Sequence, residues 1–543
     1  MSTGLDTETL DIILAAIQDF AAKRVPATLL RELDARNECP EDILREMYSP
    51  QFGIHLLFIP QEYGGMEAGA YDIYRVSEAI ARIDLGLASA VLATFLGLDP
   101  IIIGGTPDQK HKWMTRVAEE GLVVAYAVTE PTAGSDLAAL RTRADPEVKD
   151  GQVVGYRLNG SKQFITNGSI ADLYTILATS PGGFSFFIVE KGAEGFTQGR
   201  PEDKHGIRIS DTAPLTFENV CVPAENLVGG VEGQGMVQAQ HVFGYTRLMV
   251  ATFGLGAGTA ALERAISYAK ERVQAGSPLI EKQAYTHKLL VPHVVCLEAA
   301  RAYIEEISRR IDAGESELNT EGAVAKLIAT EAGDAAADAA IQALGGYGYM
   351  REYEVERIRR DVRITTIYEG TSEMMEWTIA RDRWRNHLQT RGQYYAQIAP
   401  TLDALHARAP NVGAGIAALV FRTLQVILER ARLGRLTRNQ HILFRLGEWI
   451  ALAESAASMA RYAADEREKV SGFASPVVQA MSRIYAREAA MRIATEGLRW
   501  IHGTQDQDNV AELEAALNLA GVYRAQRGLL ADNDLVAQAL RDS

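Results

Sequence analysis

VVAYAVTE at residues 123–130 opens the stretch that decides the fold, and it is followed by VVGYRLNG (153–160), ADLYTILAT (171–179), FSFFIVEK (184–191) and APLTFENV (213–220). These short runs are rich in β-branched and aromatic residues, and their period of two is typical of strands. Turn signals such as Asn159-Gly160 and Asn167-Gly168 separate them. Between about 121 and 230 the sequence therefore predicts an antiparallel β barrel or sandwich.

Helical patterns lie on both sides of this region. Residues 10–25 and 72–83 repeat apolar residues at three- and four-residue spacing. Helix returns from about 234, first as one long stretch whose small residues allow close packing, and then near 282–313 and 319–344. The order predicts an α+β fold. Its expected parts are an N-terminal α-helical domain (1–120), a β domain (121–233) and a four-helix bundle domain (234–387).

Residues 388–543 are helical again and predict an additional C-terminal helical domain. The Pro- and Gly-containing segment 409–415, APNVGAG, is interpreted as a linker. Beyond it, 416–434, 439–466 and 475–501 carry apolar stripes that require a partner surface.

Composition narrows the classes of function. The chain has 543 residues with 55 basic and 70 acidic side chains, a net charge of −15 that disfavours nucleic acid as a partner. Its three cysteines, without C-x-x-C spacing, exclude a disulfide framework and a cysteine-built metal site, so no metal is expected. Neither a secretory signal nor a transmembrane segment is recognised. We expect a cytoplasmic protein.

One short segment is a candidate for catalysis. Residues 367–373, IYEGTSE, precede a predicted helix that Thr371 or Ser372 can cap, with Glu373 in its first turn. Glu369 lies just before the cap, next to Gly370, where the backbone can approach a ligand closely. Taken alone, the segment fits a solvent-exposed loop glutamate better than a catalytic one.

Two further segments could bind a polar ligand. Residues 126–136, YAVTEPTAGSD, run from a strand into a turn whose N–H groups and hydroxyls suit a ring edge or a phosphate. Residues 342–349, QALGGYGY, place a glycine cluster after a long helix. The cluster is either the C-cap of that helix or a stretch of backbone whose lack of side chains lets a pyrophosphate bind close to it. Each segment alone is more simply a turn or a cap.

Together with KQFITNG (162–168) and the Arg272…Gln283 pair, these segments resemble the acyl-CoA dehydrogenase family, in the right order over residues 10–387. The family fold is a helical domain, a β domain and a four-helix domain. The resemblance implies a flavoprotein oxidoreductase with FAD as cofactor and an acyl-CoA as substrate.

The resemblance also assigns residues. It makes Glu369 the catalytic base, and Thr246, which replaces the alternative base of some relatives, cannot act as one. Contacts with the same subunit's FAD fall on Tyr126, Val128, Thr129, Ser135, Phe164, Thr166, Thr371 and Glu373. Contacts with a partner subunit's FAD fall on Arg272, Gln283, Gln342, Gly345 and Gly346, which requires a dimer. Substrate contacts fall on Ser135, Arg247 and Gly370.

Two positions depart from the family pattern. Many relatives have Trp where this chain has Phe164, and the Phe of the family's R-x-x-F-G motif is Ala275 here. The second change puts one aromatic contact with the partner's FAD in doubt.

The expected reaction removes the α-proton of an acyl-CoA with Glu369 and the β-hydride with FAD, giving the 2-enoyl-CoA. Electrons are then expected to pass to an electron-transfer flavoprotein. The alternatives are an acyl-CoA oxidase that uses oxygen and a catalytically silent relative acting as an assembly or binding protein.

Substrate and assembly follow less directly. Leu87 and Leu92 stand where relatives select the acyl group, and both are apolar, which favours a hydrophobic acyl chain over a glutaryl-type carboxylate. The extra length resembles the C-terminal extension of very-long-chain acyl-CoA dehydrogenases. It predicts a soluble homodimer whose extension packs on its own dehydrogenase core, against the rival of a membrane-binding helix.

Overall fold

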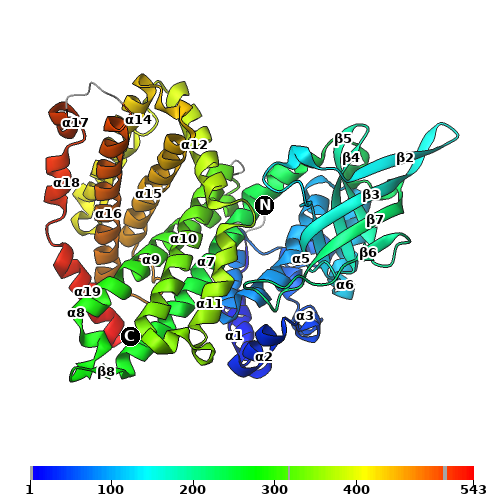
Figure 1. The fold of residues 1–543 in the computed structure, drawn as a ribbon, viewed down its shortest axis with the longest axis horizontal. Coiled ribbons are helices and arrows are strands. Elements are labelled where there is room, and N and C mark those ends of the chain that lie inside the picture. Colours follow the sequence, from blue (N-terminus) through cyan, green and yellow to red (C-terminus); the bar gives the residue numbers. More distant parts are fainter. Residues whose placement is uncertain (1–3, 316–317, 505–509) are drawn as a thin grey trace. The chain divides into compact units, whose positions relative to one another are not determined.

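The computed structural model describes residues 4–315, 318–504 and 510–543, with only the backbone for 243–245. These residues form two compact units, which Figure 1 draws together. The first unit comprises Met1–Gly256, Ser308–Asn319 and Arg360–Ile364, and the second comprises Ala257–Ile307, Thr320–Arg359 and Thr365–Ser543. The division into four domains stays a prediction.

The first unit begins with helices, as predicted. They are α1 (Thr7–Arg24), α2 (Ala27–Arg36), α3 (Glu41–Met47), α4 (Ala70–Ile83), α5 (Leu85–Gly104) and α6 (Pro107–Glu120). The Asp6 side chain caps α1, and Thr106 and Gln109 form a capping box on α6. Of the helices described, α5 is long and apolar enough to cross a membrane, but 78% of its apolar window is buried, and it packs on β1 and α4.

A single curled sheet follows in this unit (Figure 1). Its strands are β1 (Val124–Ala127), β2 (Arg143–Lys149), β3 (Gln152–Thr166), β4 (Leu173–Ser180), β5 (Gly183–Glu190), β6 (Phe196–Gln198) and β7 (Thr212–Pro223). Their order is β1-β4-β2-β3-β7-β6, and β5 pairs with β4. The predicted strands and the α+β class are confirmed.

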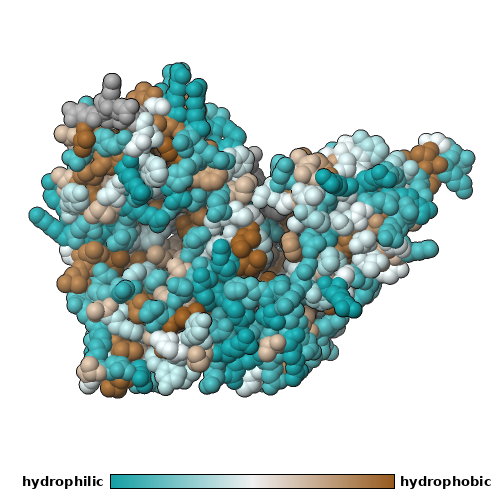
Figure 2. Space-filling view, viewed as in Figure 1, coloured by the Kyte–Doolittle hydropathy of each residue, from teal (hydrophilic) through white to brown (hydrophobic). Residues whose placement is uncertain are grey.

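Two pairings differ from the antiparallel prediction, because β4 runs parallel to β2 as well as to β1. The Asp172 N–H donates to Val123 O, and the Asp172 carboxylate accepts from Val123 N at 2.9 Å. Strands β1 and β4 therefore start at the same end of the sheet. At its far end, the β2–β3 hairpin exposes Val148, Val153 and Val154, where Figure 2 shows a hydrophobic patch.

Long helices dominate the rest of the chain. They are α7 (Gly235–Glu271), α8 (Gln283–Leu289), α9 (Val291–Asp312), α10 (Asn319–Leu344), α11 (Val355–Val362) and α12 (Ser372–Gln389). The predicted close packing through small residues is present, since a Cβ on Gly258 of α7 would lie 2.7 Å from Gly333 Cα of α10. The helix predicted at 282–313 is interrupted at Leu290, just before Pro292, whose ring disfavours an uninterrupted helix.

The extension continues the second unit as helices. They are α13 (Ile398–Arg408), α14 (Ala414–Leu433), α15 (Gln440–Ala464), α16 (Ser475–His502), α17 (Val510–Ala516), α18 (Leu519–Ala525) and α19 (Leu529–Asp542). Figure 1 shows α14, α15 and α16 side by side, and they contact one another. The linker interpretation of 409–415 is wrong, because this segment is a tight turn between α13 and α14 with Val412 buried.

A buried polar cluster joins the extension to the helices before it. The Glu454 carboxylate of α15 accepts from Arg383 Nε of α12 at 2.7 Å and from Arg383 Nη2 at 3.1 Å. It also accepts from the hydroxyls of Tyr395 at 2.8 Å and Tyr303 at 3.2 Å. The prediction that the extension packs on the chain's own helical bundle is thus confirmed within the second unit.

Candidate active site

The first group of predicted site residues leaves the end of β1. Tyr126 lies in β1, half-buried against Phe186 with ring centroids 5.7 Å apart, and Val128 is buried just beyond the strand. Thr129 follows and is half-buried. Its carbonyl accepts a hydrogen bond from Gln163 N at 2.9 Å, which fixes this segment beside β3.

The second group lies on β3, where the pairing with β7 is interrupted between Lys162 and Ile165. At this irregularity Phe164 adopts a φ of +59°, and its side chain is 63% exposed. A bulky residue rarely has a positive φ, so the bulge turns an aromatic ring outward at a cost in backbone strain. The structure therefore brings Thr129 and the Phe164–Thr166 segment together, although some 35 residues separate them in sequence.

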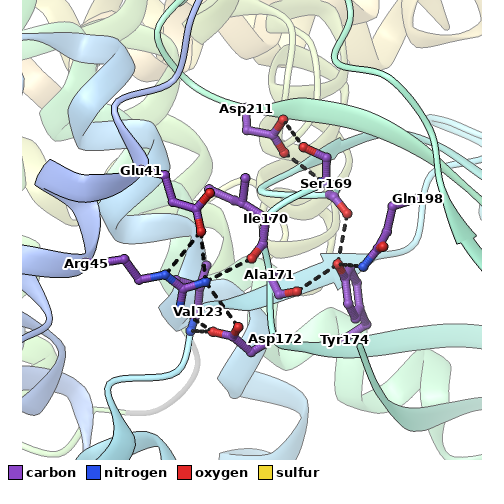
Figure 3. Close-up of polar contacts among 11 residues, drawn as sticks. Glu41, Arg45, Val123, Ser169, Ile170, Ala171, Asp172, Tyr174, Gln198 and Asp211 are labelled. Carbon is purple, nitrogen blue, oxygen red and sulfur yellow. Dashed lines mark hydrogen bonds and ion pairs between the residues drawn. The ribbon is translucent and has the colours of Figure 1, made fainter. Parts of the chain in front are cut away.

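Polar contacts fix the turn after Thr166 (Figure 3). Ser169 donates to the Asp211 carboxylate from its N–H at 2.8 Å and from its hydroxyl at 2.7 Å. Arg45 of α3 donates to Ile170 O and pairs with Asp172, while Tyr174 donates to Ala171 O. The end of β3 is consequently held by groups from the N-terminal helices and from the sheet.

Ser135 and Arg247 are the remaining predicted residues of the first unit. Ser135 is exposed in the turn after the Glu130–Ala133 bridge, and its hydroxyl has no hydrogen-bond partner among the described residues. Arg247 is half-buried on α7 and donates to Asn319 Oδ1 at 2.7 Å.

In the second unit, Glu369 sits in a strained turn. Its φ is +55°, the φ of Gly370 is +94°, and a Cβ on Gly370 would lie 2.6 Å from Met375 Cε. Only glycine fits there without displacing Met375. Thr371 caps α12 by accepting from Met374 N at 3.3 Å, as predicted, and Glu373 is exposed in the first turn.

A pocket of the second unit is lined by four of the five residues predicted to contact a partner's FAD. Its volume is about 500 Å³. Arg272, Gln342, Gly345 and Gly346 line it, with Tyr268, Gln274, Leu279, Ala343, Leu344, Tyr347 and Met350. Arg272 also lies over the Tyr347 ring, 5.9 Å from its centroid. Ala275 has a φ of +47° in the turn next to this pocket.

Gln283 is the exception among these five. Its side chain points to the extension, where Nε2 donates to Asp534 Oδ1 of α19 at 2.8 Å. The same carboxylate oxygen lies 3.1 Å from His287 Nε2. The structure therefore gives Gln283 a protein partner that its place in the motif does not indicate.

Two lysines were missed by the sequence reasoning. Lys162 and Lys326 are both completely buried, and each donates to a backbone carbonyl of a predicted site segment: Lys162 to Val128 O and Lys326 to Gly370 O. The one signal available in sequence was a single lysine within an apolar or small-residue run, as in VAKLIAT. Lysine is almost never fully buried without a partner.

The residues present fit a flavin dinucleotide. A Cβ on Gly345 or Gly346 would meet no heavy atom within 4 Å, so this backbone faces open space in the pocket, beside a guanidinium suited to phosphate. In the first unit, the outward-turned Phe164 and the half-buried Thr129 offer a ring surface and hydrogen-bonding groups to a flat heterocycle.

Comparison with known families agrees with this geometry. Models described as the N-terminal, middle and C-terminal domains of acyl-CoA dehydrogenase match residues 7–121, 125–220 and 233–383. The chain belongs to the acyl-CoA dehydrogenase family. It is an FAD-dependent oxidoreductase acting on acyl-CoA, with a C-terminal extension beyond the matched domains.

Similar proteins extend the comparison. The cyclohex-1-ene-1-carbonyl-CoA dehydrogenase of Geobacter metallireducens is 36% identical over 381 residues, 69% of this chain and 98% of that protein. Butyryl-CoA dehydrogenase from Megasphaera elsdenii is 35% identical with a TM-score of 0.64, covering 69% of this chain and 97% of that one. An acyl-CoA dehydrogenase from Bacillus anthracis, solved with FAD, covers 99% of this chain and 95% of its own at a TM-score of 0.84 and 25% identity. This acyl-CoA dehydrogenase thus shares its extension with a solved relative.

Proposed function

We propose that this acyl-CoA dehydrogenase converts an apolar acyl-CoA to the 2-enoyl-CoA and passes the electrons to an electron-transfer flavoprotein. Glu369 is the general base in this proposal. The observation that carries it is the built turn around Glu369, in which a buried lysine holds the next carbonyl, Gly370 tolerates the positive φ, and Thr371 caps the helix that follows. These three features restrict the backbone on either side of Glu369, as is expected for a catalytic carboxylate that must be held in one position.

In the reaction, the Glu369 carboxylate takes the proton from the α-carbon as the C–H bond breaks. The Glu369 N–H is proposed to donate to the thioester carbonyl, where negative charge develops. When bound, FAD supplies the two-electron acceptor for the hydride that leaves the β-carbon. We assign Tyr126, Val128, Thr129, Phe164 and Thr166 to the flavin ring.

The same proposal assigns other residues to the substrate and to the phosphate and adenosine parts of FAD. Ser135, Arg247 and Gly370 bind substrate, and Ser135 also contacts the FAD phosphate. Thr371 and Glu373 contact the adenosine of the same subunit's FAD. Arg272, Gln342, Gly345 and Gly346 receive a partner subunit's FAD, supported by the pocket they share. Gln283 joins them only if it exchanges Asp534 for the cofactor.

The preference for an apolar acyl group is supported by Leu87 and Leu92, which are both buried on α5 with no carboxylate-binding side chain at either position. The cyclic acyl group in the name of the Geobacter relative and the short one in the name of the Megasphaera relative bracket the range to be tested.

A homodimer in the cytoplasm completes the proposal. It is supported by the pocket for a second subunit's cofactor, by the extension that covers the helical bundle, and by three free cysteines. Light scattering of the purified protein tests it. A tetramer mass overturns the prediction of a dimer. Strong co-sedimentation with liposomes favours the rival interpretation, in which a helix of the extension binds a membrane.

The decisive experiment is an activity panel. Purified protein is assayed with CoA thioesters of short, long and cyclic acyl groups, using an artificial electron acceptor in one series and oxygen in another. Rapid turnover with the artificial acceptor and little peroxide supports a dehydrogenase. Comparable turnover with oxygen supports the oxidase alternative, and a flavin-free, inactive protein supports the silent relative.

A further inference from the structure

The first unit buries an ion pair directly behind the segment assigned to the flavin ring. Lys162 of β3 has no exposed side-chain surface, and its Nζ lies 2.7 Å from Glu130 Oε1, whose side chain is 2% exposed. Burying two charges is expensive, and such pairs are often no more stabilising than apolar residues of similar size. A structural role alone therefore gives little reason for a lysine here.

Every polar atom of the pair has a defined partner. Lys162 Nζ also donates to Val128 O at 3.0 Å. The Glu130 carboxylate accepts from Arg141 N at 2.7 Å and from Thr142 N at 3.0 Å. Burial lowers the pKa of Lys162 to about 8, and Glu130 opposes this effect, so the ammonium is the main form at neutral pH.

The carbonyl that accepts the hydrogen bond from Lys162 belongs to Val128, one of the residues assigned to the flavin ring. Val128 C=O and Thr129 N–H belong to the same peptide unit. An ammonium that donates to the carbonyl polarises this unit and strengthens its N–H as a donor. Within the described part of the chain the Thr129 N–H has no hydrogen-bond partner, whereas the Thr129 carbonyl is occupied by Gln163 N.

The same lysine also precedes the bulge that exposes Phe164. Lys162 points into the interior two positions before Phe164, whose positive φ turns the ring outward. Fixing the lysine to Val128 O and Glu130 thus ties together the two segments assigned to the flavin.

We propose that Lys162, held by Glu130, is a positioning residue that tunes the flavin: its ammonium polarises the Val128–Thr129 peptide so that Thr129 N–H donates more strongly to the ring. This inference rests on the FAD site of the proposed function. Since the reduced ring carries more negative charge than the oxidised ring, a stronger donor favours reduction.

The test compares full-length variants loaded with FAD. Lys162→Met removes the cation at similar length, and Lys162→Arg retains it. Lys112→Met is the control, because Lys112 forms an exposed ion pair with Glu225 at 3.0 Å in the same unit. FAD content, the visible flavin spectrum and the midpoint potential against redox dyes are measured for each.

We expect Lys162→Met to shift the equilibrium about tenfold toward the oxidised cofactor, which is about 30 mV for a two-electron couple. The flavin spectrum should shift as well. Lys162→Arg should restore most of both properties, and Lys112→Met should leave them unchanged. A wild-type potential in FAD-loaded Lys162→Met overturns the inference while leaving the proposed function standing.

A second variant covers the case in which Lys162→Met folds poorly because Glu130 is left buried without its partner. Lys162→Met/Glu130→Gln removes both charges together and should show the same tenfold shift. A wild-type potential in this double variant also overturns the inference. If the wild-type protein itself binds no flavin, the proposed function fails instead.

Discussion

The buried polar cluster around Glu454, which joins the extension to the helices before it, gives the most quantitative prediction. Glu454→Ala removes a carboxylate that accepts four hydrogen bonds, two from Arg383 and one each from Tyr395 and Tyr303. Breaking a buried ion pair from one side costs about 3–5 kcal/mol. Arg383 keeps a second carboxylate, Glu321, at 2.9 Å, so the value expected is about 3 kcal/mol.

Hydrogen exchange of the α15 amides under native conditions measures this change directly, because local opening of the extension exposes them. A loss of about 3 kcal/mol speeds exchange roughly a hundredfold, since each 1.4 kcal/mol is a factor of ten. Glu454→Gln, which keeps an acceptor but no charge, should lose about half as much free energy. FAD should be saturating in all samples so that cofactor loss does not contribute.

Glu468→Ala is the matched control. Glu468 is exposed in the loop after α15, and within the described residues it has no ion pair, so its removal should change the free energy by less than about 0.5 kcal/mol. Equal exchange rates in α15 for Glu454→Ala and Glu468→Ala would refute the reasoning that the buried cluster holds the extension.

The other predictions concern the base, the cofactor and pH. Glu369→Gln should retain FAD and lose roughly two to four orders of magnitude in turnover, measured with an artificial acceptor; comparable turnover removes the assigned base. Arg272→Ala should release FAD during gel filtration, and full flavin occupancy contradicts a contact there. Burial raises the pKa of Glu454, but Arg383 outweighs it and holds that pKa below 4.5. A carboxylate whose pKa is lower in the folded than in the unfolded protein stabilises the fold when it is ionised. The contacts of Glu454 should therefore stabilise the extension above pH 4.5, and this stabilisation should be lost as the pH falls further. Near-UV circular dichroism of wild type and Glu454→Gln checks this, since the difference between them should vanish in acid.

Local patterns predicted local structure well. The strands, the cap at Thr371 and the N-terminal helices depend on nearest neighbours and on periodicity, and all are present. The prediction of one helix over 282–313 was wrong at Leu290, and Pro292 is the signal in the sequence for that break, since proline disfavours an uninterrupted helix.

Contacts between distant residues were harder to predict. The parallel pairing of β1 and β4 depends on Asp172 meeting Val123. Lys162 and Lys326 look like surface residues in sequence, since their burial is decided by a carbonyl or a carboxylate elsewhere in the chain. Family motifs assigned roles to single residues, and the groups that hold those residues became visible only in the fold.

The bond between Gln283 and Asp534 has a consequence for how this sequence can evolve. It joins α8 to α19 across 251 residues, and from α8 the Tyr285 hydroxyl donates at 3.0 Å to Ala343 O, in the wall of the Arg272 pocket. α8 therefore contacts both the extension and the wall of the pocket. Positions 287 and 534 should covary among relatives that share the extension, and relatives that lack it should be free to vary at 287.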